Sequence, residues 1–291
     1  MNTQFFLDSG DPHETTAAIR LLGVLDGQTT NPSLVAKHPD VSARIASGEL
    51  FSNDELLALY KTAVQKMREL LPNGSISIEV YADQYTSAED MFEQATIMQQ
   101  WIPDAHIKLP ITAEALKAAR MCLDAGMKLN MTLCFTQQQA AAVYAATKGA
   151  KPGDVFVSPF IGRLDDRGER GMDLIRNIVQ MFREAGDGHV QVLAASARNA
   201  DHVAAAIEAQ ADIVTVPLNV WEEWVQAGKP EMTQNAQEEL ASIPYETVDL
   251  EASIDSFNIQ HDLTDAGIER FANDWNDLIK PEEAAQKANI S

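Results

Sequence analysis

The chain has 291 residues, of which 45% are hydrophobic and 22% are charged, a composition typical of a globular protein with a large core. Acidic residues outnumber basic residues by 43 to 22, and the net charge of −21 argues against nucleic acid and anionic membranes as partners. The sequence contains no run of about 18 apolar residues, so it predicts no membrane-spanning helix.

The two cysteines and the N-terminal stretch bear on where the protein works. Cys122 and Cys134 lie in apolar-periodic segments without the spacing of a zinc site, and we interpret them as buried free thiols. The N-terminal stretch MNTQFFLDSGDPHE lacks the basic region and the long apolar stretch of a signal peptide. We therefore expect a cytoplasmic protein.

Short apolar strands alternate with helical stretches from residue 4 to about residue 228. The predicted strands are 4–9, 27–31, 75–83, 106–110, 128–135, 154–162, 189–196 and 212–218. Eight strands separated by helices indicate parallel βα units of the α/β class, and eight such units predict a closed (β/α)8 TIM barrel.

Helix signals lie between these strands. Ser52 and Glu55 form a capping-box pattern at the start of a predicted helix. One face of that helix carries Leu56, Leu59, Ala63, Met67 and Leu70. The helix belongs to a connection over residues 41–72 that is unusually long for a βα unit.

The periodic pattern changes after residue 228. Residues 229–259 are polar and acidic, and the following segment LTDAGIERFANDWNDLI places Ile268, Phe271, Trp275 and Ile279 on one helical face. We predict a catalytic barrel over residues 1–228, then a polar linker and a C-terminal helix over 229–291. That helix is expected to pack on its own barrel or on a neighbouring subunit of a homo-oligomer.

Polar side chains converge on the inside of the predicted barrel. Lys108 lies between Ile107 and Leu109, whose parity suits the face toward the helices, so Lys108 is expected to point inward. The same alternation directs five further polar side chains inward: Asp8, Glu79, Asn130, Thr132 and Ser158. Because catalytic groups of such barrels lie at the carboxyl ends of the strands, this set predicts an active site there.

The chemistry that this set permits centres on Lys108. A lysine among apolar walls loses the stabilisation of its charged form, and the free amine is a nucleophile that forms Schiff bases with carbonyl substrates. Asp8 and Glu79 could then transfer protons. His106 shares the parity of Lys108 but lies one layer below it, so we interpret it as structural. No nucleotide-binding loop, HExxH motif or cysteine-nucleophile pattern offers a competing chemistry.

Two arginines and a hydroxyl group follow adjacent strands. Arg163 comes after the sixth strand in SPFIGR, and Ser196 and Arg198 come after the seventh in AASARN. Arginines bind phosphate oxygens in a bidentate manner, so the three side chains predict a phosphate site. Arg167 and Arg170, in RLDDRGER, are interpreted as surface residues.

Six ordered motifs resemble the transaldolase family: LDGQTTNPSLV, IKLP, LNMTLCFTQQQA, VSPFIGRLDD, LAASARN and ADIVTVPLNV. The similarity extends over about residues 4–225 and resumes at LTDAGIERFANDW. It implies a (β/α)8 barrel of the class I, Schiff-base kind, without a metal or an organic cofactor.

The resemblance also implies a role for individual residues. Lys108 matches the Schiff-base lysine, Asp8 the acid/base for the 4-hydroxyl group, and Glu79 with Thr132 the pair that holds the water of imine formation. Asn31, Asn130 and Ser158 match the groups that bind the dihydroxyacetone hydroxyls, and Arg163, Ser196 and Arg198 match the phosphate site. The implied substrate-binding set comprises Thr30, Asn31, Asn130, Ser158, Phe160, Arg163, Ser196 and Arg198.

The resemblance thus implies a transaldolase of the pentose phosphate pathway, which moves a dihydroxyacetone unit from sedoheptulose 7-phosphate or fructose 6-phosphate to an aldose phosphate. One alternative is the related fructose-6-phosphate aldolase, in which glutamine and tyrosine stand in the places of Glu79 and Phe160. A sulfosugar transaldolase and a barrel that binds sugar phosphates without turnover remain further alternatives. If residues 41–72 or 229–259 cover the barrel mouth, substrate preference would differ from that of the shortest family members.

Overall fold

The computed structural model describes residues 3–232 and 239–281. Eight parallel strands close into a barrel in the order β1 to β8, each paired with its neighbours in sequence and β1 with β8. The strands are β1 (Gln4–Asp8), β2 (Gly27–Thr29), β3 (Ser75–Glu79), β4 (Ala105–Pro110), β5 (Lys128–Cys134), β6 (Val155–Pro159), β7 (Val190–Ala194) and β8 (Ile213–Val216). The predicted TIM barrel is therefore confirmed.

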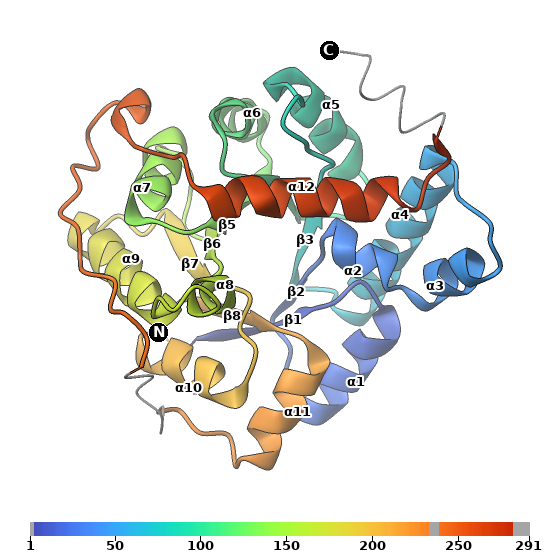
Figure 1. Ribbon diagram of the computed structural model, residues 1–291, viewed down its shortest axis with the longest axis horizontal. Coiled ribbons are helices and arrows are strands. Elements are labelled where there is room, and N and C mark those ends of the chain that lie inside the picture. Colours follow the sequence, from blue (N-terminus) through green and yellow to red (C-terminus); the bar gives the residue numbers. More distant parts are fainter. Residues whose placement is uncertain (1–2, 233–238, 282–291) are drawn as a thin grey trace.

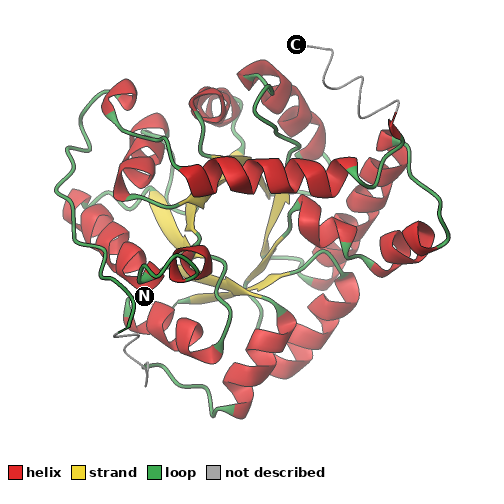
Figure 2. Ribbon diagram, in the orientation of Figure 1, coloured by secondary structure: helices red, strands yellow, loops and turns green. Residues whose placement is uncertain are grey.

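Helices form a ring around this barrel (Figure 1; Figure 2). They are α1 (Pro12–Leu22), α2 (Pro32–Ala36), α3 (Pro39–Ala46), α4 (Asn53–Leu70), α5 (Ala88–Met98), α6 (Ala113–Asp124), α7 (Gln137–Ala146), α8 (Ile161–Asp165), α9 (Gly171–Ala185), α10 (Ala200–Glu208), α11 (Leu218–Gln226) and α12 (Asp262–Asn276), with a 3-10 turn at Ile254–Ser256. Within the described residues, no helix is long and apolar enough to cross a membrane.

Most strands end within a few residues of their predicted ends, but β3 stops at Glu79 instead of residue 83. The reason lies at Tyr81, whose backbone N–H donates to Gln94 Oε1 at 2.9 Å and whose carbonyl accepts from Gln94 Nε2 at 3.0 Å. The side chain of Gln94 thus occupies the groups that a neighbouring strand would pair, and the chain leaves the sheet.

The barrel interior has an aromatic layer below the polar one. His106 stacks on Phe156 with ring centroids 4.1 Å apart, and Phe6 meets Phe156 edge-on. The His106 ring is also hydrogen-bonded through both nitrogens, to Ser75 Oγ at 3.0 Å and the Gly153 carbonyl at 2.9 Å. Burial lowers the pKa of His106 to about 4. These contacts agree with the structural interpretation of His106.

The long connection after β2 contains α2, α3 and α4. Ser52 and Glu55 form the predicted capping box of α4. Leu56, Ala63 and Met67 are buried as expected, whereas Leu70 is 37% exposed. The helix turns instead so that Tyr60 and Val64 complete its buried face. Both α2 and α4 contact α12, the latter through the rings of Tyr60 and Trp275.

The segment that follows α11 runs along the outside of the barrel. Ala241 pairs through its backbone with Gly168 and Arg170, and Asn177 of α9 donates to the Ile243 carbonyl at 3.0 Å. Residues 239–259 therefore pass α9 and α7 before the chain reaches α12 (Figure 1). Residues 239–259 therefore do not cover the barrel mouth, which α12 crosses instead.

In this chain α12 lies across its own barrel (Figure 1). Ile268, Phe271 and Trp275 are buried, as is Ile279 just beyond the helix. Thr264 Oγ1 donates to the Leu133 carbonyl at 2.9 Å, which ties the start of the helix to β5.

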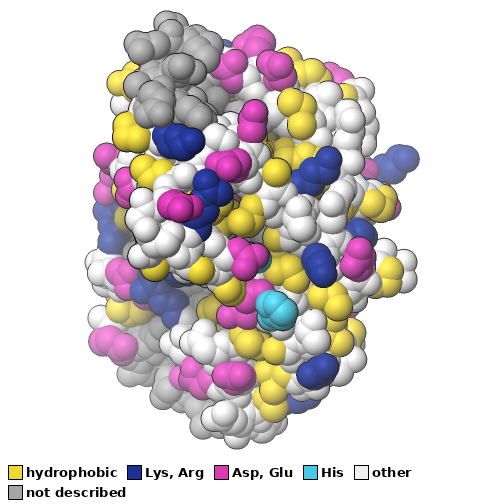
Figure 3. Space-filling view, turned by 90° about the vertical axis from the view of Figure 1, so that its right-hand side faces the viewer, with side chains coloured by type: hydrophobic (Ala, Val, Ile, Leu, Met, Phe, Trp, Pro, Cys, Tyr) yellow, Lys and Arg dark blue, Asp and Glu magenta, His cyan; other side chains and the backbone are white. Residues whose placement is uncertain are grey.

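Two further predictions concern surface and thiol residues. Arg167 is partly exposed and pairs with Asp262 at 2.7 Å, so it helps to hold the start of α12 instead of being only a solvated charge. Arg170 is more buried than expected, because its guanidinium group donates to the Leu240 carbonyl at 3.2 Å and lies 3.7 Å from Asp173. Cys122 and Cys134 are buried free thiols, as predicted, and burial raises the pKa of each to about 12. The face on the side of α3 and α4 shows acidic, basic and hydrophobic side chains interspersed (Figure 3).

Candidate active site

A cavity of about 230 Å³ opens at the carboxyl ends of the strands. Its lining includes nine of the predicted site residues: Asp8, Asn31, Lys108, Thr132, Ser158, Phe160, Arg163, Ser196 and Arg198. Thr30, Glu79 and Asn130 are not part of this lining. Lys37, Arg270 and Phe271 also line the cavity, and none of the three was predicted as a site residue from the sequence.

The strand register brings the central ionisable groups into one layer. Lys108 of β4 is paired in register with Glu79 of β3 and with Asn130 of β5. Lys108 Nζ lies 2.9 Å from Glu79 Oε2 and donates to the Thr30 carbonyl at 3.2 Å. The Phe271 ring lies 5.8 Å from the same nitrogen, within reach of a cation–π interaction. Helix α12 thus closes the site above the lysine.

The Lys108–Glu79 pair is almost completely withdrawn from solvent. Burial raises the pKa of Glu79 to about 7, although the charge of Lys108 acts in the opposite direction. A carboxylate with such a pKa can take up a proton at neutral pH. Glu79 can therefore give or accept a proton beside the side chain of Lys108.

Asp8 at the end of β1 is the second carboxylate of the site. Its Oδ1 accepts from Thr29 Oγ1 at 2.7 Å, and Thr29 in turn lies 2.7 Å from the hydroxyl of Thr215. Burial raises the pKa of Asp8 above its usual value, against the effects of Lys108 and of the Thr29 hydrogen bond. Because Asp8 lines the cavity, it can exchange a proton with a molecule bound there.

Thr132 carries a hydroxyl group with an unused bonding capacity. Its Oγ1 is buried and has no hydrogen-bond partner among the residues that the structure describes. Such groups are rare in folded proteins and call for an explanation. Next to it, β5 has a register shift between Met131 and Cys134, with Leu133 at φ 61°. The irregular strand end places a free hydroxyl in the cavity, where it can bind a substrate or a water molecule.

Two predicted substrate ligands lie behind the cavity wall. Asn130 is fully buried; it accepts from Ser158 Oγ at 2.6 Å and donates to Ser77 Oγ at 3.0 Å. This arrangement fixes Ser158, which does line the cavity. The Thr30 hydroxyl is directed to Tyr60 and to the Ser77 carbonyl, so the structure brings the Thr30 carbonyl to Lys108 instead.

Asn31 joins the cavity to helix α2. Its Oδ1 accepts from the Leu34 N–H at 2.9 Å and caps the helix. The amide nitrogen of Asn31 has no hydrogen-bond partner among the described residues. Since Asn31 lines the cavity, that N–H group can donate to a bound hydroxyl.

Four basic side chains line the same cavity: Lys37, Arg163, Arg198 and Arg270. Burial lowers the pKa of Arg163, and the charges of Arg270 and Arg198 add to this effect, so the three guanidinium groups are close enough to repel one another. Arg198 is held by a bidentate pair with Asp166 at 2.5 and 2.7 Å. A group of cations in mutual repulsion favours binding of an anion.

The backbone around this anion site is tightly constrained. Ser196 has φ 57°, a left-handed conformation that is uncommon for a residue other than glycine. A Cβ atom at Gly162 would lie 2.4 Å from the Ser196 carbonyl oxygen and 2.6 Å from Arg198 Nε. Glycine at 162 therefore lets the loop that carries Arg163 approach the loop that carries Arg198.

Among the described residues, no group of three or more His, Cys, Asp or Glu side chains is arranged to hold a metal ion. The fold and the cavity define a (β/α)8 barrel with a polar cavity at the carboxyl ends of its strands, where the active sites of such barrels lie.

Comparisons with known proteins agree with this class. The family model described as Transaldolase/Fructose-6-phosphate aldolase matches residues 5–282. A protein named probable transaldolase from Dehalococcoides mccartyi is 35% identical over 277 residues, which cover 95% of this chain and 100% of that protein. Proteins of the same name from Caldicellulosiruptor saccharolyticus and Anaeromyxobacter dehalogenans are 34% and 33% identical, each over 95% of this chain and over 99% and 98% of their own lengths. The chain belongs to the transaldolase/fructose-6-phosphate aldolase family.

Proposed function

We propose that the protein is a transaldolase that transfers a dihydroxyacetone unit from a ketose phosphate to an aldose phosphate through a Schiff base on Lys108. The observation that carries the proposal is the buried pair of Lys108 and Glu79 beside a cavity that also contains three arginines. The name of the relatives, probable transaldolase, supports the same activity.

The reaction begins with the neutral amine of Lys108, which attacks the ketone carbon of the donor. Glu79, which holds the proton given up by the lysine, protonates the hydroxyl group of the carbinolamine, and water leaves as the imine forms. Thr132 supplies the free hydroxyl that holds this water.

Asp8 then takes the proton of the donor's 4-hydroxyl group. The C3–C4 bond breaks, its electron pair moves into the protonated imine, and an aldehyde leaves while a three-carbon enamine stays on Lys108. An aldose phosphate takes the place of the aldehyde and the steps run in reverse. Ser158 and Asn31 bind the hydroxyls of the three-carbon unit.

The phosphate of donor and acceptor binds at Arg163, Ser196 and Arg198 in this proposal. Residues 1–228 supply the chemistry, and the C-terminal part of the chain supplies Arg270 and Phe271 through α12. The substrates are sedoheptulose 7-phosphate or fructose 6-phosphate as donors, in the pentose phosphate pathway of the cytoplasm.

Borohydride reduction tests the proposal directly. Incubation with fructose 6-phosphate and borohydride should leave a reduced three-carbon adduct on Lys108, detected by peptide mass spectrometry. Lys108→Met, which keeps the length of the side chain but not its amine, is the control and should show no adduct. Absence of an adduct in the unmodified protein would refute the Schiff-base mechanism.

An activity panel separates transfer from cleavage. Turnover of fructose 6-phosphate that requires an aldose phosphate supports a transaldolase. Equal turnover without an acceptor would assign the protein to the aldolase activity of the same family, and a preference for a sulfonated sugar would change the substrate. Saturable binding without any adduct or turnover would leave only a binding protein.

A further inference from the structure

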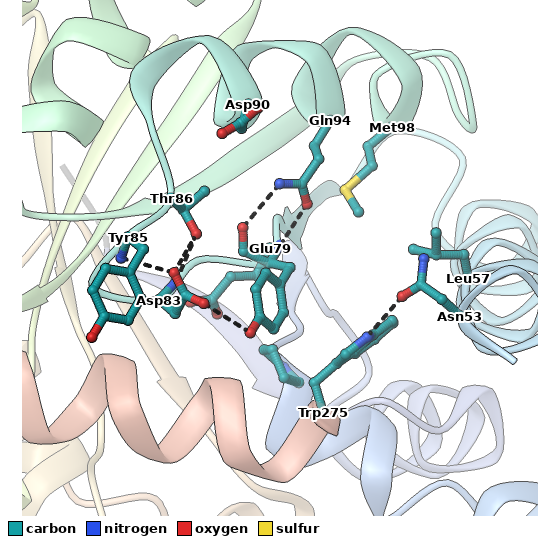
Figure 4. Close-up of a pocket in the computed structure, with 12 residues that line it drawn as sticks. Asn53, Leu57, Glu79, Asp83, Tyr85, Thr86, Asp90, Gln94, Met98 and Trp275 are labelled. Atoms are coloured by element: carbon teal, nitrogen blue, oxygen red, sulfur yellow. Dashed lines mark hydrogen bonds between the residues drawn. The ribbon is translucent and has the colours of Figure 1, made fainter. Parts of the chain in front are cut away.

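A second cavity, of about 260 Å³, lies beside β3 (Figure 4). Its walls come from Asn53 and Leu57 of α4, Gln94 and Met98 of α5, and Trp275 of α12. The segment after β3 completes the lining with Tyr81, Asp83, Tyr85 and Thr86. Tyr85 is 66% exposed, so the cavity reaches the surface of the protein at this segment.

Glu79 forms the inner end of this second cavity. Its side chain lines the second cavity and not the substrate cavity, whereas Lys108 lines the substrate cavity and not the second one. The two side chains, 2.9 Å apart, therefore lie at the boundary between the two cavities. Lys108 is the one partner of the Glu79 carboxylate among the described residues, which leaves this carboxylate free to bind water.

A smaller space adjoins the same carboxylate. It measures about 10 Å³, close to the volume that one water molecule requires. Pro32, Glu79 and Tyr81 line both this space and the second cavity, so the two are neighbours.

Hydrogen bonds keep the second cavity open. Tyr81 Oη donates to Asp83 Oδ2 at 3.2 Å and accepts from Asn276 Nδ2 at 3.1 Å, while Gln94 holds the Tyr81 backbone from α5. Trp275 Nε1 donates to Asn53 Oδ1 at 3.2 Å, which ties α12 to the start of α4. The walls are thus fixed by side chains from three helices and one loop.

We propose that the second cavity is the path by which water reaches and leaves Lys108, with Glu79 at its inner end. The inference rests on the proposed Schiff-base function. In imine formation the C–O bond of the carbinolamine breaks, the proton on Glu79 goes to the departing hydroxyl, and the nitrogen lone pair forms the C=N bond. One water molecule must leave while the sugar phosphate still fills the substrate cavity. In hydrolysis water adds to the imine carbon and Glu79 takes its proton.

The test fills the second cavity at points remote from Glu79. Leu57→Trp and Thr86→Trp place an indole in the cavity from two separate elements, and Leu59→Trp on the same helix is the matched control, because Leu59 is partly buried but does not line the cavity. Rates of imine formation are measured by rapid quenching with borohydride after mixing with fructose 6-phosphate, so that the phosphorylated sugar fills the substrate cavity. Rates of hydrolysis are measured as the exchange of labelled oxygen from water into the C2 position of fructose 6-phosphate.

We expect both rates to fall about tenfold in Leu57→Trp and Thr86→Trp, equivalent to about 1.4 kcal/mol on the barrier. The dissociation constant for fructose 6-phosphate and both rates of the Leu59→Trp control should stay unchanged. Rates equal to those of the unmodified protein in the two cavity variants, with folding verified by circular dichroism, would overturn the water path and leave the Schiff-base proposal intact. No adduct in the unmodified protein would overturn both.

Discussion

Lys108 Nζ lies 2.9 Å from Glu79 Oε2, and each of the two side chains is only 4% exposed. The pair belongs to neighbouring strands at the same level of the barrel. Removing two charges from water costs free energy that offsets much of their mutual attraction, so such a pair adds little to the stability of the fold. The pair matters for chemistry instead, because it places the carboxyl group of Glu79 beside the amine of Lys108.

Lys108→Met should abolish transfer activity and make the free energy of unfolding depend more strongly on the protonation of Glu79. The folded pKa of Glu79 already lies above its unfolded value, so its contribution to stability is present at low pH and is lost as the pH rises through about 7. Without the lysine charge, that folded pKa should rise further. Urea unfolding should therefore show the free energy of unfolding of the variant falling with increasing pH to beyond pH 7, by about 1.4 kcal/mol per pH unit.

The double variant Lys108→Met with Glu79→Gln provides the control, because the amide does not titrate. Its free energy of unfolding should lack the contribution of Glu79, so the difference between the two variants should grow as the pH rises towards 7 and beyond. A Lys108→Met profile parallel to that of the double variant would show that Glu79 is not a desolvated acid.

Catalysis should depend on the titration of Glu79. Its carboxylate must be ionised to accept a proton during imine formation, so kcat/KM should fall below an apparent pKa of about 7. Glu79→Gln should remove this limb and lower kcat by about 10² to 10⁴. Steady-state kinetics across the pH range test both statements, and an unchanged acid limb in Glu79→Gln would assign the titration to another group.

Strand alternation explains why the centre of the site could be predicted from the sequence. The side-chain direction of Lys108, Glu79 and Asp8 follows from parity alone, and the barrel register then brings them together. The depth of a side chain inside the barrel does not follow from parity. Asn130 has the correct parity, but it lies behind Ser158, which binds its side chain and lines the cavity.

Residues from outside the strands escaped the sequence analysis for a physical reason. Arg270 lies on α12 and Lys37 follows α2, so their positions depend on how those helices pack over the barrel mouth. The pattern of α12 marked Phe271 as buried, and Arg270 is its neighbour. The direction in which α12 crosses the mouth could not be inferred from that pattern, because the segment before it follows the outer helices.

Arg270→Ala should weaken the binding of phosphorylated substrates. Hydrogen bonds to charged groups contribute about 1.5–3 kcal/mol, but Arg270 is more than half exposed, so we expect the lower end and a KM for fructose 6-phosphate raised about tenfold. The rate of imine formation with dihydroxyacetone, which has no phosphate, should not change. Arg176→Ala on the outer helix α9 is the control, and an equal rise of KM in that variant would point to a general effect of charge.

The contact between α12 and β5 should determine how well the site is closed. Gly267 faces Leu133, and a Cβ atom at Gly267 would lie 2.6 Å from Leu133 Cδ2. Gly267→Val should therefore push α12 away from the barrel, lower the free energy of unfolding by about 1–3 kcal/mol, and raise KM because Arg270 and Phe271 move with the helix. Ala266→Val, at the exposed neighbouring position, introduces the same β-branched side chain without this contact. Helix propensity alone would stabilise Gly267→Val and destabilise Ala266→Val, so a loss of stability and a raised KM in Gly267→Val must come from the contact with Leu133. If thermal unfolding and steady-state kinetics show no such loss in Gly267→Val, the seating of α12 on Leu133 does not control the site.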